Sequence, residues 1–259
     1  MEEGANMDEM LCSVLEGRTT AYGLLARLLN REVDEELLAE LRALPFAADE
    51  AVRPNGPNGV NDANDPGRRD NAADLPIAAY SADLDEGNRL MGGYLAGIGN
   101  ESGDAQRALT DLAVDFARLF VVRKRSESVA PYPNESVHTS KEHLRMDGAR
   151  DEVRALFRAE GVRAADAWRL GEDHVALELE FMQTLAARTA EAASANDEET
   201  ADDLLSKQAS FLDRHLLNWV PAFAEAMGRT ARTDFYRGVA LLLVAHLRED
   251  RALVKQLLG

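Results

Sequence analysis

The segment Asp115-Phe-Ala-Arg-Leu-Phe120 ends an amphipathic helix, and after a basic turn the chain continues as Ala130-Pro-Tyr-Pro-Asn-Glu-Ser-Val-His138. Apolar residues up to Phe120 recur three and four positions apart, which is the spacing of one buried stripe on a helix. The two prolines keep the second segment non-helical, because each disfavours the helical conformation of the residue before it. A stiff aromatic loop beside a helix end suits peptide binding, but it equally suits an ordinary connector.

The same helical spacing extends outward in both directions from this segment. Alanine and leucine dominate the chain, β-branched residues are sparse, and no strand-like alternation is present. The sequence therefore predicts an all-α bundle of about nine to eleven helices. The expected helices cover 7–30, the stretch from the N-cap Asp34 to Pro45, 81–98 with Ser81 as N-cap, 104–122, 149–160, a longest helix opened by 171–174, 204–219, a short helix from Pro221, and 235–247.

Residues 47–75 interrupt this pattern. Pro54-Asn-Gly-Pro-Asn-Gly59 and Asn61-Asp-Ala-Asn-Asp-Pro-Gly67 are turn formers with almost nothing to bury. Such a segment cannot offset the entropy that it would lose on ordering. The two helices before it are too few to form a domain of their own. We therefore expect one domain over residues 1–259 with a flexible insertion at about 47–75.

Composition excludes several classes of protein. Of the 259 residues 46% are hydrophobic, which is enough for a sizeable core, and the net charge of −17 opposes nucleic-acid binding while it attracts basic partners. No run reaches the roughly 18 apolar residues that span a bilayer, and the acidic start lacks the features of a secretory signal. Cys12 is the only cysteine, so it has no intrachain disulfide partner. We expect a cytoplasmic protein that neither inserts into a membrane nor binds nucleic acid.

Glu172-Asp-His174, with Glu178 one helical turn further on, is the most reactive-looking combination in the chain. A carboxylate beside a histidine can act as a general base or as part of a metal site. However, no second histidine stands at His-x-x-x-His spacing, and neither a nucleophile nor a glycine-rich phosphate loop is marked out. A capped helix start with an internal ion pair explains the same residues. We expect no metal and no cofactor, and a metal-dependent hydrolase that uses Asp173 and His174 stays open as a minor alternative.

The remaining histidines and the tryptophans have simpler explanations. His215 and His246 fall within apolar helices, where we expect them to be core or near-core residues. Trp168 and Trp219 are typical of core anchors rather than of a cofactor site.

Three blocks in this order resemble the TorD/DmsD family, which belongs to the NarJ-like superfamily of redox-enzyme maturation chaperones. They are Asp115–Phe120, Pro131–Val137 and Glu172-Asp-His-Val-Ala-Leu-Glu-Leu-Glu-Phe-Met182. His215-Leu-Leu-Asn-Trp-Val-Pro221 and Thr233-Asp-Phe-Tyr236 are similar to the C-terminal half of that family. The resemblance covers roughly residues 10–250 apart from the polar insertion.

The resemblance implies a non-catalytic, all-helical chaperone. Such a protein binds the twin-arginine signal peptide, and often the apo form, of a molybdopterin-containing oxidoreductase subunit, assists cofactor insertion and holds back premature export. Some relatives serve non-exported molybdoenzymes such as nitrate reductase, so an assembly chaperone or adaptor of that kind is the main alternative. Relatives also include domain-swapped dimers, which makes a homodimer an open prospect.

The resemblance also implies where the signal peptide binds. In the family, helix-end aromatics, the proline loop and the Asp-His pair line this region, which here gives Phe116, Leu119, Phe120, Tyr132, Pro133, Ser136, Val137, Asp173 and His174. Because a carboxylate binds arginine bidentately, we expect Glu135 and Glu172 to form an acidic rim together with Asp173. Two positions depart from the family pattern: His138 replaces an aromatic residue, and Gly171 stands where proline is common.

Overall fold

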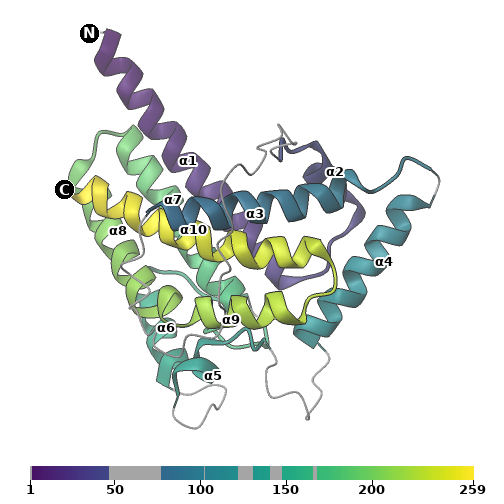
Figure 1. Cartoon of the computed structure of the whole chain (residues 1–259). Coiled ribbons are helices and arrows are strands. Elements are labelled where there is room, and N and C mark those ends of the chain that lie inside the picture. The colour runs from purple at the N-terminus through teal and green to yellow at the C-terminus, as the bar shows by residue number, and fades with distance from the viewer. Residues whose placement is uncertain (1, 47–76, 102, 122–130, 141–147, 166–167) are drawn as a thin grey trace.

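A computed structural model describes residues 2–46, 77–101, 103–121, 131–140, 148–165 and 168–259 (Figure 1). Within these ranges the chain forms ten α-helices and two π-helical turns, and the only strand-like feature is one antiparallel bridge between Asn134 and His174. The prediction of an all-α bundle is confirmed. The predicted insertion at 47–75 lies outside the described residues.

The helices follow one another along the whole described chain. Their bounds are α1 Glu2–Asn30, α2 Glu35–Ala43, α3 Ile77–Ala96, α4 Asp104–Phe116, η1 Ala117–Val121, α5 Glu135–Thr139, α6 Gly148–Ala159, α7 Val175–Ser194, α8 Glu198–Phe211, η2 Leu212–Leu216, α9 Leu217–Thr230 and α10 Asp234–Leu258.

Four of the described helices, α2, α7, α8 and α10, begin at a residue whose side chain caps the helix. Asp34 caps α2 as predicted, because its Oδ1 accepts a hydrogen bond from the backbone N–H of Leu37 at 3.0 Å. Thr233 caps α10 in the same way. Ser81, in contrast, is not an N-cap, since α3 begins four residues earlier at Ile77. The helix opened by 171–174 is also not the longest: α7 has 20 residues, whereas α1 has 29 and α10 has 25.

Two π-helical turns fall within stretches that the sequence predicted as regular helix. The first, η1, continues α4 without a break and carries the end of the Asp115–Phe120 segment. The second, η2, joins α8 to α9, so Pro221 lies inside α9 and not at the first turn of a new helix. Proline has no N–H to donate to the preceding turn. A wider turn just before the proline is one way for a helix to accommodate that loss.

Helices α3, α9 and α10 form one side of the bundle, with α10 lying along α3 (Figure 1). The close approach of α3 and α10 depends on glycine: a Cβ on Gly238 would lie 2.7 Å from the carbonyl oxygen of Gly87. Helix α1 packs along α7, which in turn contacts α8. Helices α5 and α6 lie at the end of the molecule away from the N-terminus, and α4 lies at one side (Figure 1).

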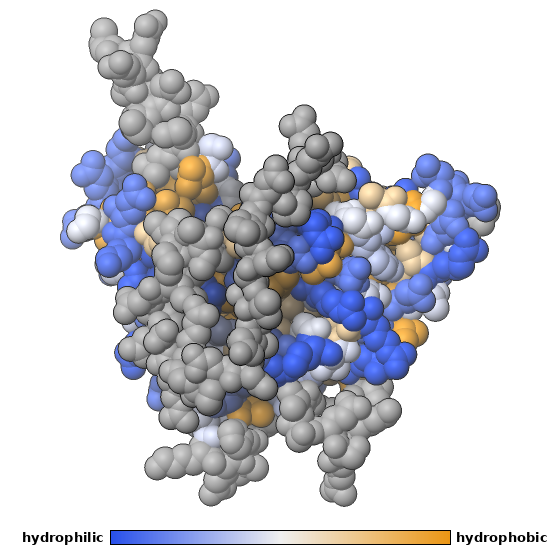
Figure 2. All heavy atoms as spheres, viewed as in Figure 1, coloured by the Kyte–Doolittle hydropathy of each residue, from blue (hydrophilic) through white to orange (hydrophobic). Residues whose placement is uncertain are grey.

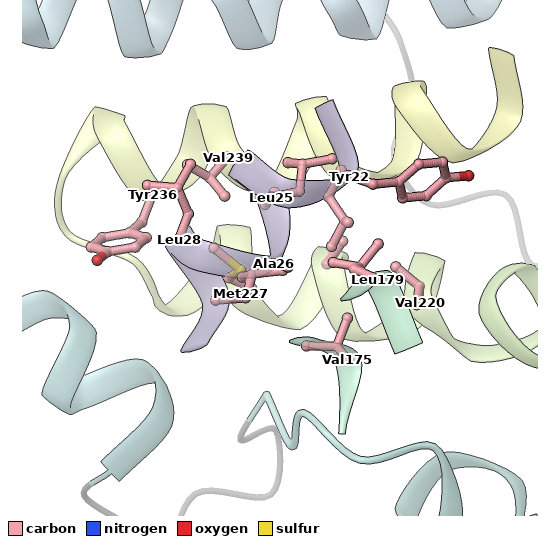
Figure 3. Close-up of a cluster of buried hydrophobic side chains, with 14 of the residues drawn as sticks. Tyr22, Leu25, Ala26, Leu28, Val175, Leu179, Val220, Met227, Tyr236 and Val239 are labelled. Carbon is pink, nitrogen blue, oxygen red and sulfur yellow. The ribbon is translucent and has the colours of Figure 1, made fainter. Parts of the chain in front are cut away.

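The core lies where α1, α7, α9 and α10 meet (Figure 3). Tyr22 and Leu28 of α1, Leu179 of α7 and Met227 of α9 point into it and are at most 1% exposed. Helix α7 is buried on nearly every side over 175–186, as expected for a helix that is apolar all round.

The outer face seen in Figure 2 is mainly hydrophilic where it is coloured, with scattered apolar residues. None of the helices in the described ranges has the length and apolar character needed to cross a membrane.

Candidate functional site

The proline loop is joined to the start of α7 by backbone hydrogen bonds. The N–H of Glu135 donates to the carbonyl of Asp173, and the N–H of Val175 donates to the carbonyl of Pro133, both at 2.9 Å. These two bonds form the Asn134–His174 bridge. Thus two segments that are about 40 residues apart, which sequence reasoning placed in one site, do lie side by side.

Asp173 holds this junction from the inside. Its Oδ2 accepts hydrogen bonds from the backbone N–H and the hydroxyl of Ser136, at 3.1 and 2.5 Å, and its Oδ1 accepts one from Asn134 Nδ2 at 3.3 Å. The side chain is fully buried, with 0% exposure. Gly171 explains one departure from the family pattern: its φ of +94° is closed to proline, and a Cβ there would lie 2.7 Å from Asp173 Oδ1.

His174 is the N-cap of α7. Its Nδ1 accepts a hydrogen bond from the N–H of Ala176 at 3.2 Å, and its ring meets Trp168 edge-on at 5.3 Å. The Trp168 indole N–H donates to the carbonyl of Gly171 at 2.7 Å. His174 is 2% exposed, so both members of the Asp-His pair are structural elements of this junction.

A second buried polar layer connects the junction to α9. Nδ1 of His215 lies 3.0 Å from Oε2 of Glu135, and the Trp219 indole N–H donates to Oε2 of Glu178 at 3.2 Å. Burial, together with the nearby charge of Glu135, raises the pKa of Glu178 well above its usual range. The predictions that His215 and Trp219 are core residues are confirmed.

The predicted acidic rim is not formed as expected. Glu135 is only 3% exposed because it faces His215, so its placement on a rim was wrong. Glu172 is half-buried and lies 2.5 Å from Nε of Arg150. Burial opposes ionisation of Glu172, but its hydrogen bonds, first of all the one with Arg150, together with the charges of Arg150 and Arg154 outweigh burial and lower the pKa of Glu172.

Aromatic contacts bring the helix-end residues to the proline loop. Phe116 and Phe120 lie 4.8 Å apart, and Phe120 is 6.4 Å from Phe223 of α9, measured between ring centroids. His138 in turn stacks near Trp219 at 5.1 Å, and its Nε2 lies 2.8 Å from the carbonyl oxygen of Tyr132. His138 therefore occupies an aromatic position in space, which accounts for the second departure from the family pattern.

Most of the predicted site residues are buried beneath the surface. Of the nine residues predicted to contact the signal peptide, only Phe120 and Tyr132 are half-buried and so reach solvent. The buried ones are Phe116, Leu119, Pro133, Ser136, Val137, Asp173 and His174.

An accessible groove that sequence reasoning missed lies beside the helix-end segment. It encloses about 530 Å³ between the start of α2, at Glu32–Glu35, and one face of α4 that ends at Ala117. Its floor is apolar, with Val33 and Leu109 buried and Val114 57% exposed. We call it the α2–α4 groove. The sequence signal for it is the acidic stretch Glu32-Val-Asp-Glu-Glu36, in which Asp34 is predicted only as an N-cap.

The rim of the α2–α4 groove is acidic. Glu32 and Glu35 are exposed, and neither side chain forms an ion pair within the described chain. Asp34 is already engaged, since its Oδ2 lies 2.6 Å from Nη2 of Arg27 while its Oδ1 caps α2.

Comparison with known proteins identifies the family. The family model described as nitrate reductase delta subunit matches residues 78–225, which is more than half of the chain. The chain belongs to the nitrate reductase delta subunit family. The matched region includes the proline loop, α7 and the α4 side of the groove, whereas α1, α2 and α10 lie outside it.

Curated relatives support membership of the nitrate reductase delta subunit family and confirm the resemblance found in the three sequence blocks. The chain is 34% identical over 162 residues to Chaperone protein TorD of Vibrio cholerae serotype O1, strain O395, covering 61% of this chain and 69% of the relative. It is 29% identical over 180 residues to Chaperone protein TorD of Vibrio parahaemolyticus, with 69% and 81% covered. For the protein of the same name from Photobacterium profundum the identity is 31% over 145 residues, with 56% and 64% covered.

Proposed function

We propose that this chain is a cytoplasmic chaperone for a molybdopterin-containing oxidoreductase subunit. It binds the twin-arginine signal peptide and the apo form of that subunit, assists cofactor insertion and holds back premature export. Membership of the nitrate reductase delta subunit family and similarity to proteins named Chaperone protein TorD support this class of function. The α2–α4 groove is the observation that carries the binding of a cationic leader.

A twin-arginine leader presents two guanidinium groups followed by an apolar stretch. The α2–α4 groove offers the complementary surfaces: Glu32 and Glu35 on the rim, and the exposed Val114 with the buried Val33 and Leu109 along the floor. Apolar contact supplies affinity along the floor, whereas bidentate carboxylate pairing at the rim distinguishes arginine from lysine.

The predicted site residues divide into two roles in this proposal. Phe120 and Tyr132 reach solvent, so they contact the apolar stretch of the leader as it leaves the groove. The buried members keep the proline loop against α7, through contacts such as those that Asp173 makes with Ser136. They therefore position the surface without touching the peptide.

The same contacts argue for a non-enzymatic role of Asp173 and His174. Asp173 is fully buried and accepts hydrogen bonds from Ser136 and Asn134, and His174 uses Nδ1 to cap α7. Neither side chain is presented to a substrate. In the described ranges no three His, Cys, Asp or Glu side chains gather into a group that would hold a metal ion.

Calorimetric titration with a synthetic leader peptide tests the proposal. We expect the twin-arginine peptide to bind more tightly than its twin-lysine counterpart. Exchanging both rim acids, Glu32→Gln with Glu35→Gln, removes two surface pairs with the leader and should weaken twin-arginine binding by about tenfold. It should also remove most of the preference for arginine over lysine.

A matched control is available at the start of α8. Glu198 and Glu199 are exposed and stand in the first helical turn, as Glu35 does in α2. Glu198→Gln with Glu199→Gln therefore changes the net charge equally and should leave leader affinity within about twofold of the original. Equal binding of both peptides to the unmodified chain, or equal losses in both double variants, would contradict the proposal.

One observation favours an alternative client. The description of the matching family names nitrate reductase. A chaperone or adaptor for a non-exported molybdoenzyme is therefore the second candidate. Such a chain would bind the folded or apo enzyme without preferring a twin-arginine leader. The peptide comparison above separates the two functions.

A further inference from the structure

A strongly basic cleft lies between α6 and the segment that leads to α7. It encloses about 450 Å³, and we call it the arginine cleft. Five guanidinium groups line it, although the chain as a whole carries a net charge of −17. They belong to Arg150, Arg154, Arg158, Arg163 and Arg169.

Part of this positive charge is neutralised within the molecule. Arg150 lies 2.5 Å from Glu172, and Arg154 lies 3.0 Å from Asp151, whose side chain is 71% exposed. An exposed ion pair such as that of Arg154 with Asp151 contributes little to stability, so Arg154 can exchange Asp151 for a carboxylate of a ligand.

Two arginines remain available to a ligand. Arg158 and Arg163 are exposed, and neither has a hydrogen-bond or ion-pair partner in the part of the chain that the structure describes. Both line the cleft, Arg158 from α6 and Arg163 from the segment that follows it. The half-buried Trp168 and Val162 also line the cleft.

The spacing of the arginines selects the shape of the ligand. Arg154 and Arg158 stand four residues apart on α6, so their guanidinium stems lie about 6 Å apart along the helix, and Arg150, which pairs with Glu172, continues the same row. In an extended peptide, side chains on one face recur every second residue, about 6.7 Å apart. The row therefore matches carboxylates at alternate positions of an extended segment. A single phosphate group instead requires donors that converge on one point.

We propose that the arginine cleft binds an extended acidic segment of the client protein, with acidic residues at alternate positions. That the acidic segment belongs to the client protein rests on the proposed function. That the cleft binds an acidic segment does not. A cationic leader is repelled from the arginine cleft and attracted to the α2–α4 groove, so the two surfaces bind different parts of the client.

The test uses two blocked pentapeptides: acetyl-Glu-Ala-Glu-Ala-Glu-amide and its analogue with glutamine in place of each glutamate. Titration calorimetry on the full chain should detect the acidic peptide only. Its binding should also change the tryptophan fluorescence, because Trp168 lines the cleft while Trp219, the other tryptophan, is 1% exposed. Trp168→Phe should remove the fluorescence change but leave the calorimetric signal.

Variants at the two available arginines test the site. Arg158→Gln with Arg163→Gln removes two charge-assisted contacts and should lower the affinity for the acidic peptide by about tenfold or more. Arg214→Gln with Arg232→Gln changes the net charge equally at exposed arginines that do not line the cleft, and should alter the affinity by less than about twofold. Equal unfolding midpoints in urea show that both variants are folded.

Three results would overturn the inference. The first is equal binding of both pentapeptides, and the second is an equal loss of affinity in both double variants. The third is that inorganic pyrophosphate binds more tightly than the acidic peptide and that its binding is lost in Arg158→Gln with Arg163→Gln. The last result would make the cleft a phosphate site. Leader binding should persist in Arg158→Gln with Arg163→Gln. If leader binding is absent from the unmodified chain while the acidic peptide binds, the proposed function fails and the arginine cleft stands.

Discussion

Among single residues, Glu178 is an ionisable side chain that is fully buried. Burial, and next the nearby charge of Glu135, raise its pKa well above the usual range. The folded chain therefore binds more protons than the unfolded chain between the usual pKa and the raised one, so the free energy of unfolding falls as pH rises through that window. We expect Glu178→Gln to remove this fall, whose slope approaches about 1.4 kcal/mol per pH unit for one proton.

Urea unfolding of both proteins at intervals from about pH 5 to pH 8 measures this slope directly. Glutamine keeps an oxygen that accepts the hydrogen bond from the Trp219 indole, so the variant isolates the charge. Glu191→Gln, at an exposed position of the same helix, should retain the slope of the unmodified chain. A slope that survives in Glu178→Gln would assign the pH dependence to other groups.

Sequence reasoning found residues whose role is decided by their neighbours along the chain. Asp34 is an N-cap because of the N–H groups that follow it, and His215 is buried because the helix around it is apolar. Glu135 could not be placed in this way. Its helix, α5, has only five residues, which is too short to show which face is covered. The partner that buries it, His215, is 80 residues away.

At the scale of helices, one buried ionic network joins three elements. Arg18 of α1 and Asp250 of α10 are paired, with Nε 2.5 Å from Oδ1 and Nη2 3.0 Å from Oδ2. The Tyr22 hydroxyl donates to Asp250 Oδ2 at 2.6 Å, and Gln208 of α8 accepts from Arg18 at 2.5 Å. Asp250→Ala leaves a buried guanidinium without its counter-ion, so we expect a loss of about 3–5 kcal/mol of unfolding free energy.

The neighbouring pair of Arg251 with Asp213 gives the control for urea unfolding at neutral pH. It has the same residue types and also reaches from α10 to another element, η2, but Asp213 is 47% exposed. Asp213→Ala should cost less than about 1 kcal/mol. Similar losses of unfolding free energy in the two variants would show that burial does not determine how much the Arg18–Asp250 pair contributes to stability.

Helix positions followed from the sequence better than helix ends did. The start of α2 and the left-handed Gly161 after α6, with φ of +67°, depend on caps that can be recognised locally. The π-helical turns η1 and η2 depend instead on how a long helix meets its neighbours in the bundle. No residue type marks such a turn, so the run through Pro221 was predicted as two separate helices.

On the scale of the whole molecule, charge is divided between surfaces in a way that the net value conceals. Acids at Glu32 and Glu35 border the α2–α4 groove, whereas arginines line the cleft beside α6. The sequence predicted a negative molecule but not this division. Arg158 and Arg163 come from a helix and from the segment after it, and only the fold brings both into the lining of one cleft.

This charge predicts that sodium chloride affects stability and leader binding in opposite directions. With a net charge of −17, surface repulsion opposes folding at low salt. Raising the salt from about 0.01 M to 1 M shortens the screening length from about 30 to 3 Å and relieves that repulsion. Salt also weakens the exposed ion pairs, but these contribute little to the free energy of unfolding. The pair of Arg18 with Asp250 is buried, so salt screens it much less.

We therefore expect the urea midpoint to rise with sodium chloride while the affinity for a twin-arginine leader falls. Both quantities are measured on the same protein preparation, by urea unfolding and by calorimetric titration at each salt concentration. The acidic rim variant Glu32→Gln with Glu35→Gln should show a weaker salt dependence of leader binding, because two of the screened contacts are gone. A leader affinity that does not change with salt would mean that the peptide is held by apolar contact alone, and the rim would then have no part in its recognition.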